Sequence, residues 1–116
     1  MFDAVVSGIN ETGTLMLTGQ LTIENIEQVR EALLDAISQY KDICVKIDNL
    51  EQIDFSFIQL FCAAHKSAEH QGKTLLLIPP KNSGNFYESL RYAGFIPHAG
   101  EEVTDSVRGF TIREER

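Results

Sequence analysis

One short apolar run constrains the fold more than any other part of the chain. Residues 74–78 read TLLLI and are followed at once by Pro79 and Pro80. A continuous apolar run of this length that ends at prolines is typical of a strand buried on both faces. Such strands occur in the parallel parts of sheets, so the run predicts a sheet that is at least partly parallel.

Three further segments read as strands. Residues 4–9 and 14–19 are separated by Asn-Glu-Thr-Gly, and Asn10 and Gly13 suit positive φ angles, so the two segments are predicted to form a hairpin. In the second of them Leu15 and Leu17 share one face. Residues 43–48 alternate with a period of two and are expected to form a third strand, followed by a loop over 49–54.

The clearest helix is predicted over residues 23–40, with Thr22 as its N-cap. Its apolar residues recur at steps of three and four and form one stripe: Ile26, Val29, Leu33, Ile37 and Tyr40. A second helix is expected over 57–71, where Ser56 and Gln59 form a capping box and Gly72 ends the helix. A third is expected over 86–93, from the capping box of Asn85 and Glu88 to Gly94.

The predicted order is therefore β-β-α-β-α-β-α. An opening hairpin followed by alternating strands and helices indicates an α/β sandwich with a mixed sheet and helices packed against it. The 116 residues allow one domain, with a core over about 5–98. For residues 100–116 a docked helix, a strand and a frayed end all remain open.

Composition excludes several classes of partner. Seventeen acidic against ten basic residues give a net charge of −7, which disfavours nucleic acids and anionic membranes. No apolar run is long enough to insert into a bilayer, and the first residues lack the pattern of a secretory signal. Cys44 and Cys62 have no CxxC spacing and read as small core residues, so a reduced, cytoplasmic protein is expected.

A search for catalytic or metal-binding patterns finds none. The glycine-rich phosphate loops are missing from the sequence. His65 and Glu69 stand four residues apart, a spacing that is more often a solvated helix face than a metal site. Asp48, Glu51 and Asp54 read as turn formers and helix-start residues rather than as acid–base catalysts. The sequence thus predicts no enzyme, no metal and no cofactor.

The segment from 44 to 60 resembles the STAS family, the domain of sulfate transporters and anti-sigma factor antagonists. The family pattern is an apolar strand that ends in Asp, a short loop, a tetrad of Asp, two small residues and Gly, and then an apolar helix. Here the strand ends at Asp48 and the tetrad is Asp54-Phe55-Ser56-Phe57. Three further steps fit in the same order: Gly19-Gln20-Leu21-Thr22, Gly72-Lys73-Thr74-Leu75 and Ala93-Gly94-Phe95.

The resemblance implies a non-enzymatic switch. In anti-sigma factor antagonists the Ser or Thr after the tetrad Asp is phosphorylated, but Phe55 occupies that position here and Phe57 occupies the glycine position. Ser56 lies one residue later and is a candidate either for phosphorylation or for a plain N-cap role. Phe55 is either an apolar anchor for a partner or a residue packed under the loop, and the sequence does not choose.

The function predicted is therefore a regulatory module that binds another protein through residues 49–59. An anti-sigma factor, a serine kinase or a chemotaxis-type signalling protein would be its partner, and Asp54, Phe55, Ser56 and Gln59 its binding residues. The alternative is a STAS subunit that stabilises the ATPase of a lipid-transport ABC complex. The oligomeric state is left open.

Overall fold

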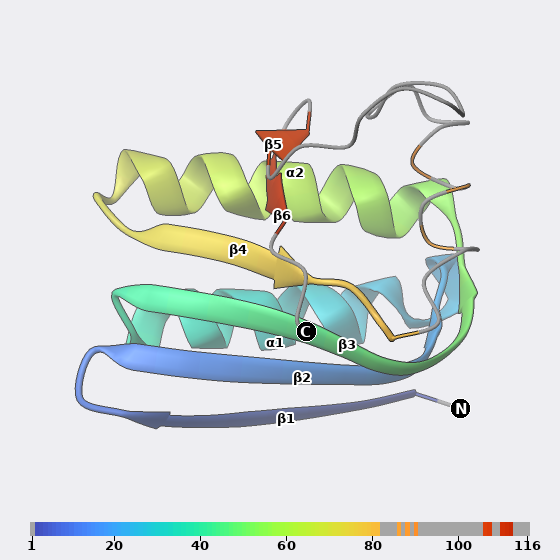
Figure 1. Cartoon of the computed structure of the whole chain (residues 1–116), viewed down its shortest axis with the longest axis horizontal. Helices are drawn as coiled ribbons and strands as arrows, with labels where there is room; N and C mark the ends of the chain where they lie inside the picture. The colour runs from blue at the N-terminus through green and yellow to red at the C-terminus, as the bar shows by residue number, and fades with distance from the viewer. Residues whose placement is uncertain are drawn as a thin grey trace.

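A mixed β-sheet forms one layer of the molecule. The computed structural model describes residues 2–81, the single residues Phe86, Glu88 and Leu90, and the segments 106–107 and 110–112. Within them the strands are β1 (Phe2–Ile9), β2 (Thr12–Leu21), β3 (Asp42–Ile53), β4 (Thr74–Ile78), β5 (Ser106–Val107) and β6 (Phe110–Ile112), and their order across the sheet is β1-β2-β3-β4-β6-β5 (Figure 1). The pairs β2–β3, β3–β4 and β4–β6 are parallel, whereas β1–β2 and β5–β6 are antiparallel. The mixed sheet predicted from the sequence is confirmed.

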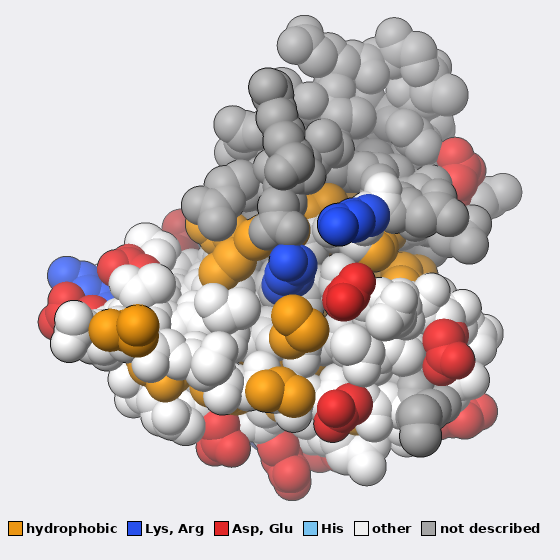
Figure 2. All heavy atoms as spheres, turned by 60° about the horizontal axis from the view of Figure 1, so that its bottom comes forward, with side chains coloured by type: hydrophobic (Ala, Val, Ile, Leu, Met, Phe, Trp, Pro, Cys, Tyr) orange, Lys and Arg blue, Asp and Glu red, His pale blue; other side chains and the backbone are white. Residues whose placement is uncertain are grey.

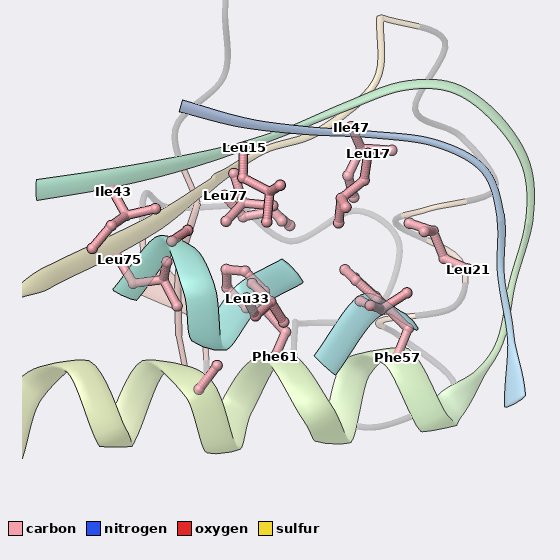
Figure 3. Close-up of a cluster of buried hydrophobic side chains, with 14 of the residues drawn as sticks. Leu15, Leu17, Leu21, Leu33, Ile43, Ile47, Phe57, Phe61, Leu75 and Leu77 are labelled. Carbon is pink, nitrogen blue, oxygen red and sulfur yellow. The ribbon is translucent and has the colours of Figure 1, made fainter. Parts of the chain in front are cut away.

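Two α-helices and the inward face of the sheet share one hydrophobic core. The 3₁₀ turn η1 (Ile23–Asn25) leads into α1 (Ile26–Gln39), and α2 (Phe55–His70) connects β3 to β4. Phe57 and Phe61 of α2 point toward the sheet, where Leu15, Leu17 and Leu77 meet them (Figure 3). The alternation predicted for 43–48 is confirmed, since Ile43, Val45 and Ile47 are all buried in this core.

The hairpin is longer than predicted, and its turn is tighter. Its loop is only Asn10-Glu11, where Asn10 takes a φ of 57°. Gly13 lies inside β2, opposite Gly8, and not in the turn. A Cβ atom at either glycine would clash with the ring of Tyr40, which follows α1. Glycine is therefore needed here to admit an aromatic ring, and not to make the turn.

The third strand does not end where the sequence indicated. Residues 49–53 were expected in a loop, but β3 continues through them to Ile53 and stays paired with β2. The pairing shifts register on either side of Gly19, which has a φ of 94°, and Asn49 takes a φ of 47°. These bulges place extra residues in β3 without ending the ladder, which a period-of-two pattern does not reveal.

The ends of the helices follow the sequence in part. The predicted helix 23–40 begins as the 3₁₀ turn η1 and becomes α-helical only at Ile26, and the side chain of Thr22 makes no capping hydrogen bond. The end of α2 at Gly72 is confirmed. Gly72 has a φ of 71°, its N–H donates to the Glu69 carbonyl over 3.0 Å, and the Lys73 N–H donates to the Ala68 carbonyl over 2.8 Å. This is the Schellman pattern of hydrogen bonds.

In the C-terminal third, the structure describes three residues of the predicted third helix and two short strands. Phe86, Glu88 and Leu90 are helical, and Phe86 and Leu90 are fully buried. The rest of the predicted helix 86–93 and its predicted cap, Asn85, lie outside the described residues. In the segment 100–116, of the three open alternatives, the described residues 106–107 and 110–112 form strands.

The cysteine prediction needs correction. Both cysteines are half-buried rather than fully packed. Cys62 contacts the core from α2, but Cys44 alternates with the core residues Ile43 and Val45 and so lies on the opposite face of the sheet. Within the described part of the chain, no helix is long and apolar enough to cross a membrane.

Candidate functional site

The candidate site lies at the edge of the sheet where two neighbouring parallel strands end. Leu21 and Ile53, the last residues of β2 and β3, are paired across the sheet. Each strand leads within a few residues into a helical segment, η1 after β2 and α2 after β3. Binding sites in sheets with parallel strands are commonly formed at the carboxyl ends of the strands, from the segments that follow them.

Asp54 joins these two segments. Its carboxylate accepts a hydrogen bond from the N–H of Ser56 at Oδ1 over 3.0 Å and one from the N–H of Ile23 at Oδ2 over 2.9 Å. The N–H of Asp54 in turn donates to the Leu21 carbonyl over 3.2 Å. One side chain thus caps α2 and also holds the first residue of η1, so the two helix starts are fixed relative to each other.

The surroundings of Asp54 favour its charged form. Partial burial by itself would raise the pKa of the carboxyl group, but hydrogen bonds from the Ser56 side chain and from backbone N–H groups outweigh it, and the pKa is lowered below its ordinary value. The carboxylate is therefore ionised at neutral pH. A negative charge at the start of α2 also interacts favourably with the helix dipole.

The predicted capping box at Ser56 is wrong. Helix α2 begins at Phe55 and not at residue 57, and its N-cap is Asp54, which has an extended backbone. Ser56 is inside the first turn, and its hydroxyl donates to the Asp54 carboxylate rather than accepting from a backbone N–H. Both side chains are good caps, but an aspartate two residues earlier accepts from the N–H of Ser56 and reaches the N–H of Ile23 as well.

Two large apolar side chains are exposed beside this carboxylate. Phe55 is 49% exposed and Ile23 is 64% exposed, whereas Leu21, Phe57 and Ile58 just beyond them are buried. Gln59, one helical turn after Phe55, is also exposed. We call Ile23, Asp54, Phe55, Ser56 and Gln59 the Asp54 surface. It combines two exposed apolar side chains with a carboxylate that holds two backbone N–H groups, and exposed apolar patches often mark interaction sites.

Phe55 and Phe57 have opposite environments although they are two residues apart. Phe57 is fully buried, and its ring packs on Phe61 with the centroids 6.0 Å apart. The aromatic residue at the family's glycine position therefore belongs to the core. Phe55 instead keeps half of its surface in solvent, so it is not packed beneath the preceding segment.

Sequence reasoning named four residues of this surface and missed Ile23. Ile23 stands three residues before Ile26, so the spacing places it on the apolar stripe of the following helix, and the sequence gives no signal that it is exposed. Its position beside Asp54 depends on a hydrogen bond between residues 31 apart in the chain, which no local pattern encodes.

The other side chains considered from the sequence do not join this site. The Nδ1 atom of His65 is 3.3 Å from the carboxylate of Glu69 on the same helix, an ordinary pair four residues apart. Among the described residues, no three His, Cys, Asp or Glu side chains come together as metal ligands would. Burial raises the pKa of the Cys62 thiol, although the charge of Lys66 partly opposes this, so Cys62 is not an activated nucleophile.

Comparison with known proteins gives the family. A family model described as "Mlab, STAS domain" matches residues 6–95. A search of curated protein sequences found no match. Among solved structures, the phosphorylated form of the Bacillus cell fate determinant SpoIIAA has a TM-score of 0.60 at 20% identity, covering 79% of this chain and 84% of SpoIIAA.

Two further structures share the fold. The putative anti-sigma factor antagonist tm1081 from Thermotoga maritima has a TM-score of 0.68 at 18% identity and covers 97% of this chain and 86% of its own. An anti-sigma factor antagonist from Mycobacterium paratuberculosis has a TM-score of 0.70 at 6% identity. The match covers 81% of this chain and 79% of the antagonist. The TM-scores show a common fold, and the family model covers most of the sequence. The chain belongs to the STAS domain family.

Proposed function

We propose that this chain is a non-enzymatic regulatory domain that binds a partner protein through the Asp54 surface. The observation that carries the proposal is the exposure of Phe55, which follows Asp54 in the chain, and of Ile23, whose N–H is held by the Asp54 carboxylate together with that of Ser56. An apolar side chain held in this way binds without a large loss of conformational freedom. The partner classes that fit a domain similar to anti-sigma factor antagonists are an anti-sigma factor, a serine kinase or another signalling protein.

The regulation we propose does not use Ser56 as a phosphate acceptor. The hydroxyl of Ser56 donates to the Asp54 carboxylate. A phosphate on Ser56 would lose that hydrogen bond and place about two negative charges beside an ionised aspartate. We therefore assign Ser56 a positioning role, and we expect control of the interaction to act on the partner.

The test is a comparison of two variants with matched exposure. Phe55→Ala removes the proposed anchor, and Leu34→Ala removes a side chain that is 46% exposed on α1 and lies outside the Asp54 surface. Tagged wild type and both variants are purified from the native cell, and bound proteins are quantified by mass spectrometry. A partner of the proposed kind should bind the Leu34→Ala variant with the affinity of the wild type. Its affinity for the Phe55→Ala variant should be at least about tenfold lower, as when a buried aromatic anchor is removed.

Binding must then be measured with the purified partner, and two outcomes oppose the proposal. A partner that binds the Phe55→Ala and Ile23→Ala variants as tightly as the wild type would show that another surface is used. A high fraction of phosphorylated Ser56 in the recovered protein would contradict its positioning role. If the wild type recovers a transporter ATPase and the Phe55→Ala variant does not, the Asp54 surface is still the binding surface. The alternative role, a subunit of a lipid-transport ABC complex, would then be favoured.

A further inference from the structure

The outer edge of β1 has the features of a strand that pairs with another strand. In the part of the chain that the structure describes, β1 stands at the end of the strand order, with β2 on one side only (Figure 1). It is eight residues long, contains no proline, and pairs with β2 from Phe2 to Ile9 without a bulge. Its one ionisable side chain is Asp3. Edges that must stay unpaired usually carry several charges, a proline or a bulge.

The backbone of this edge is available for a full ladder. The loop has two residues, so the flanking pair Ile9–Thr12 closes the turn with a hydrogen bond, and alternate pairs along the hairpin do the same. The odd-numbered residues of β1 therefore direct their N–H and C=O groups toward β2. Those of Phe2, Ala4, Val6 and Gly8 point away from the sheet, toward the open edge.

The side chains of the open face continue to this edge. Val5 is 55% exposed and is paired with Met16, which is paired with Lys46, so the three form one row across β1, β2 and β3 on the face opposite the helices. Figure 2 brings β1 forward and shows hydrophobic side chains beside acidic and basic ones on this side of the molecule. Ile9, at the end of the same strand, is 78% exposed.

From this geometry we infer that two copies of the chain pair antiparallel through β1, with Val5 of one copy opposite Val5 of the other. The two-fold axis keeps each face of the sheet continuous, so only residues on the same face meet. In this register Ala4 faces Val6, and Asp3 faces Ser7 of the second copy, whose hydroxyl is a donor for the carboxylate. Apolar residues thus meet apolar ones, and no like charges are opposed.

Neighbouring registers are less favourable. A two-fold axis at Asp3 brings two carboxylates together and shortens the ladder. An axis at Val6 sets Asp3 against Ile9 and Val5 against Ser7, which separates the apolar pairs. With the axis at Val5, the β1 edge of each copy is paired with that of the other. No β1 edge is left open, so the product is a dimer and not a fibre.

The oligomeric state of the full chain tests the inference. Sedimentation of the wild type from micromolar to sub-millimolar concentration is expected to show a monomer–dimer equilibrium. Val5→Lys places a charge against its own copy across the axis and is expected to be monomeric throughout. Leu34→Lys, the same change at an exposed position on α1, should dimerise as the wild type does. A monomeric wild type, larger assemblies, or a dimeric Val5→Lys variant would overturn the proposal.

A crosslink tests the register. Val5 and its copy form a pair without hydrogen bonds, whose Cα atoms are about 4.5 Å apart, within the range for a disulfide. Val5→Cys should therefore form a covalent dimer under mild oxidation. Ile9→Cys, although more exposed, should not, because the two Ile9 residues lie at opposite ends of the paired strands. Equal crosslinking of both variants would indicate random collision and contradict this register.

Discussion

Asp54 is the residue on which the geometry of the candidate site depends. Its carboxylate holds the N–H groups of Ser56, two residues away, and of Ile23, 31 residues away in the chain. A conventional N-cap satisfies only its own helix. Here the same side chain also fixes the position of an exposed apolar residue relative to Phe55, so stability and binding geometry are linked at one residue.

Replacement of Asp54 should show both parts of this role. Asp54→Ala is expected to lower the free energy of unfolding by about 1–3 kcal/mol, because it removes a cap and leaves two N–H groups without their acceptor. Asp54→Asn keeps one acceptor oxygen, so its free energy of unfolding should fall by less. Urea denaturation measures both, and Asp35→Ala, an exposed aspartate on α1, is the control, with an expected change under about 0.5 kcal/mol. Equal losses at positions 35 and 54 would contradict the assignment.

The free energy of unfolding should also depend on the ionisation of Asp54 when the pH is lowered. Its pKa is lowered in the folded state by hydrogen bonds that outweigh the effect of burial, so the unfolded chain binds the proton more tightly. The stabilisation is fully present above the unfolded pKa, and it is lost as the pH falls through the folded pKa. The difference in unfolding free energy between wild type and Asp54→Asn should therefore be constant between about pH 5 and 8 and shrink below about pH 4. A difference that grows in acid would refute this.

At the scale of elements, the hairpin and α1 are joined by a ring placed over two glycines. Gly8 and Gly13 face each other in β1 and β2, and a Cβ atom at either would clash with Tyr40. The ring covers the backbone where neither strand offers a side chain, which is how aromatic residues compensate glycine within sheets. Gly72 has a different role, since a Cβ atom there would meet nothing and only its φ of 71° requires glycine.

A double-mutant cycle separates these two roles. Gly13→Ala should lower the free energy of unfolding by about 1–3 kcal/mol through overpacking. Gly72→Ala should lower it by about 1 kcal/mol through backbone strain. When Tyr40 is replaced by Ala, the cost of Gly13→Ala should fall because the ring no longer occupies the space, whereas the cost of Gly72→Ala should not change. Thermal or urea unfolding of the five variants gives both coupling energies. An unchanged cost at Gly13 would mean that the ring is not what requires glycine.

The sequence pattern predicted those elements whose signals are local. Period-two and helical stripes identified the inward faces of β2, β3 and α1, the proline pair ended β4, and Gly72 ended α2. The extension of β3 to Ile53 was missed because it depends on register shifts at Gly19 and on a positive φ at Asn49. No apolar alternation marks such bulges.

The candidate site was predicted only in outline, for a related reason. Asp54, Phe55, Ser56 and Gln59 were named, but the start of α2 was placed two residues late. Local rules rank Asp and Ser almost equally as caps. What decides between them is the N–H of Ile23, brought to the carboxylate by the pairing of β2 with β3. The exposure of Ile23 follows from the same tertiary contact.

At the scale of the whole molecule, the core and the proposed surfaces are separate. One cluster of buried side chains joins α1, α2 and the inward face of the sheet (Figure 3). The Asp54 surface is at the carboxyl ends of β2 and β3. The edge through which we propose that two copies pair is the outer edge of β1. Substitutions of Phe55 or Val5, which are about half exposed, should therefore change binding or assembly without a comparable loss of stability.

The net charge of −7 acts on the whole molecule and should make both its stability and its pairing depend on salt. Excess negative charge repels itself in the compact state, and more strongly still between two paired copies. Raising the salt concentration from about 0.01 M to 0.3 M shortens the Debye length from about 30 Å to below 8 Å and should raise both the melting temperature and the dimer fraction. Near the pH at which the net charge vanishes, the same addition of salt should have little effect on either. Melting curves and sedimentation at both pH values measure this, and a dimer weakened by salt at neutral pH would mean that opposite charges hold the two copies together.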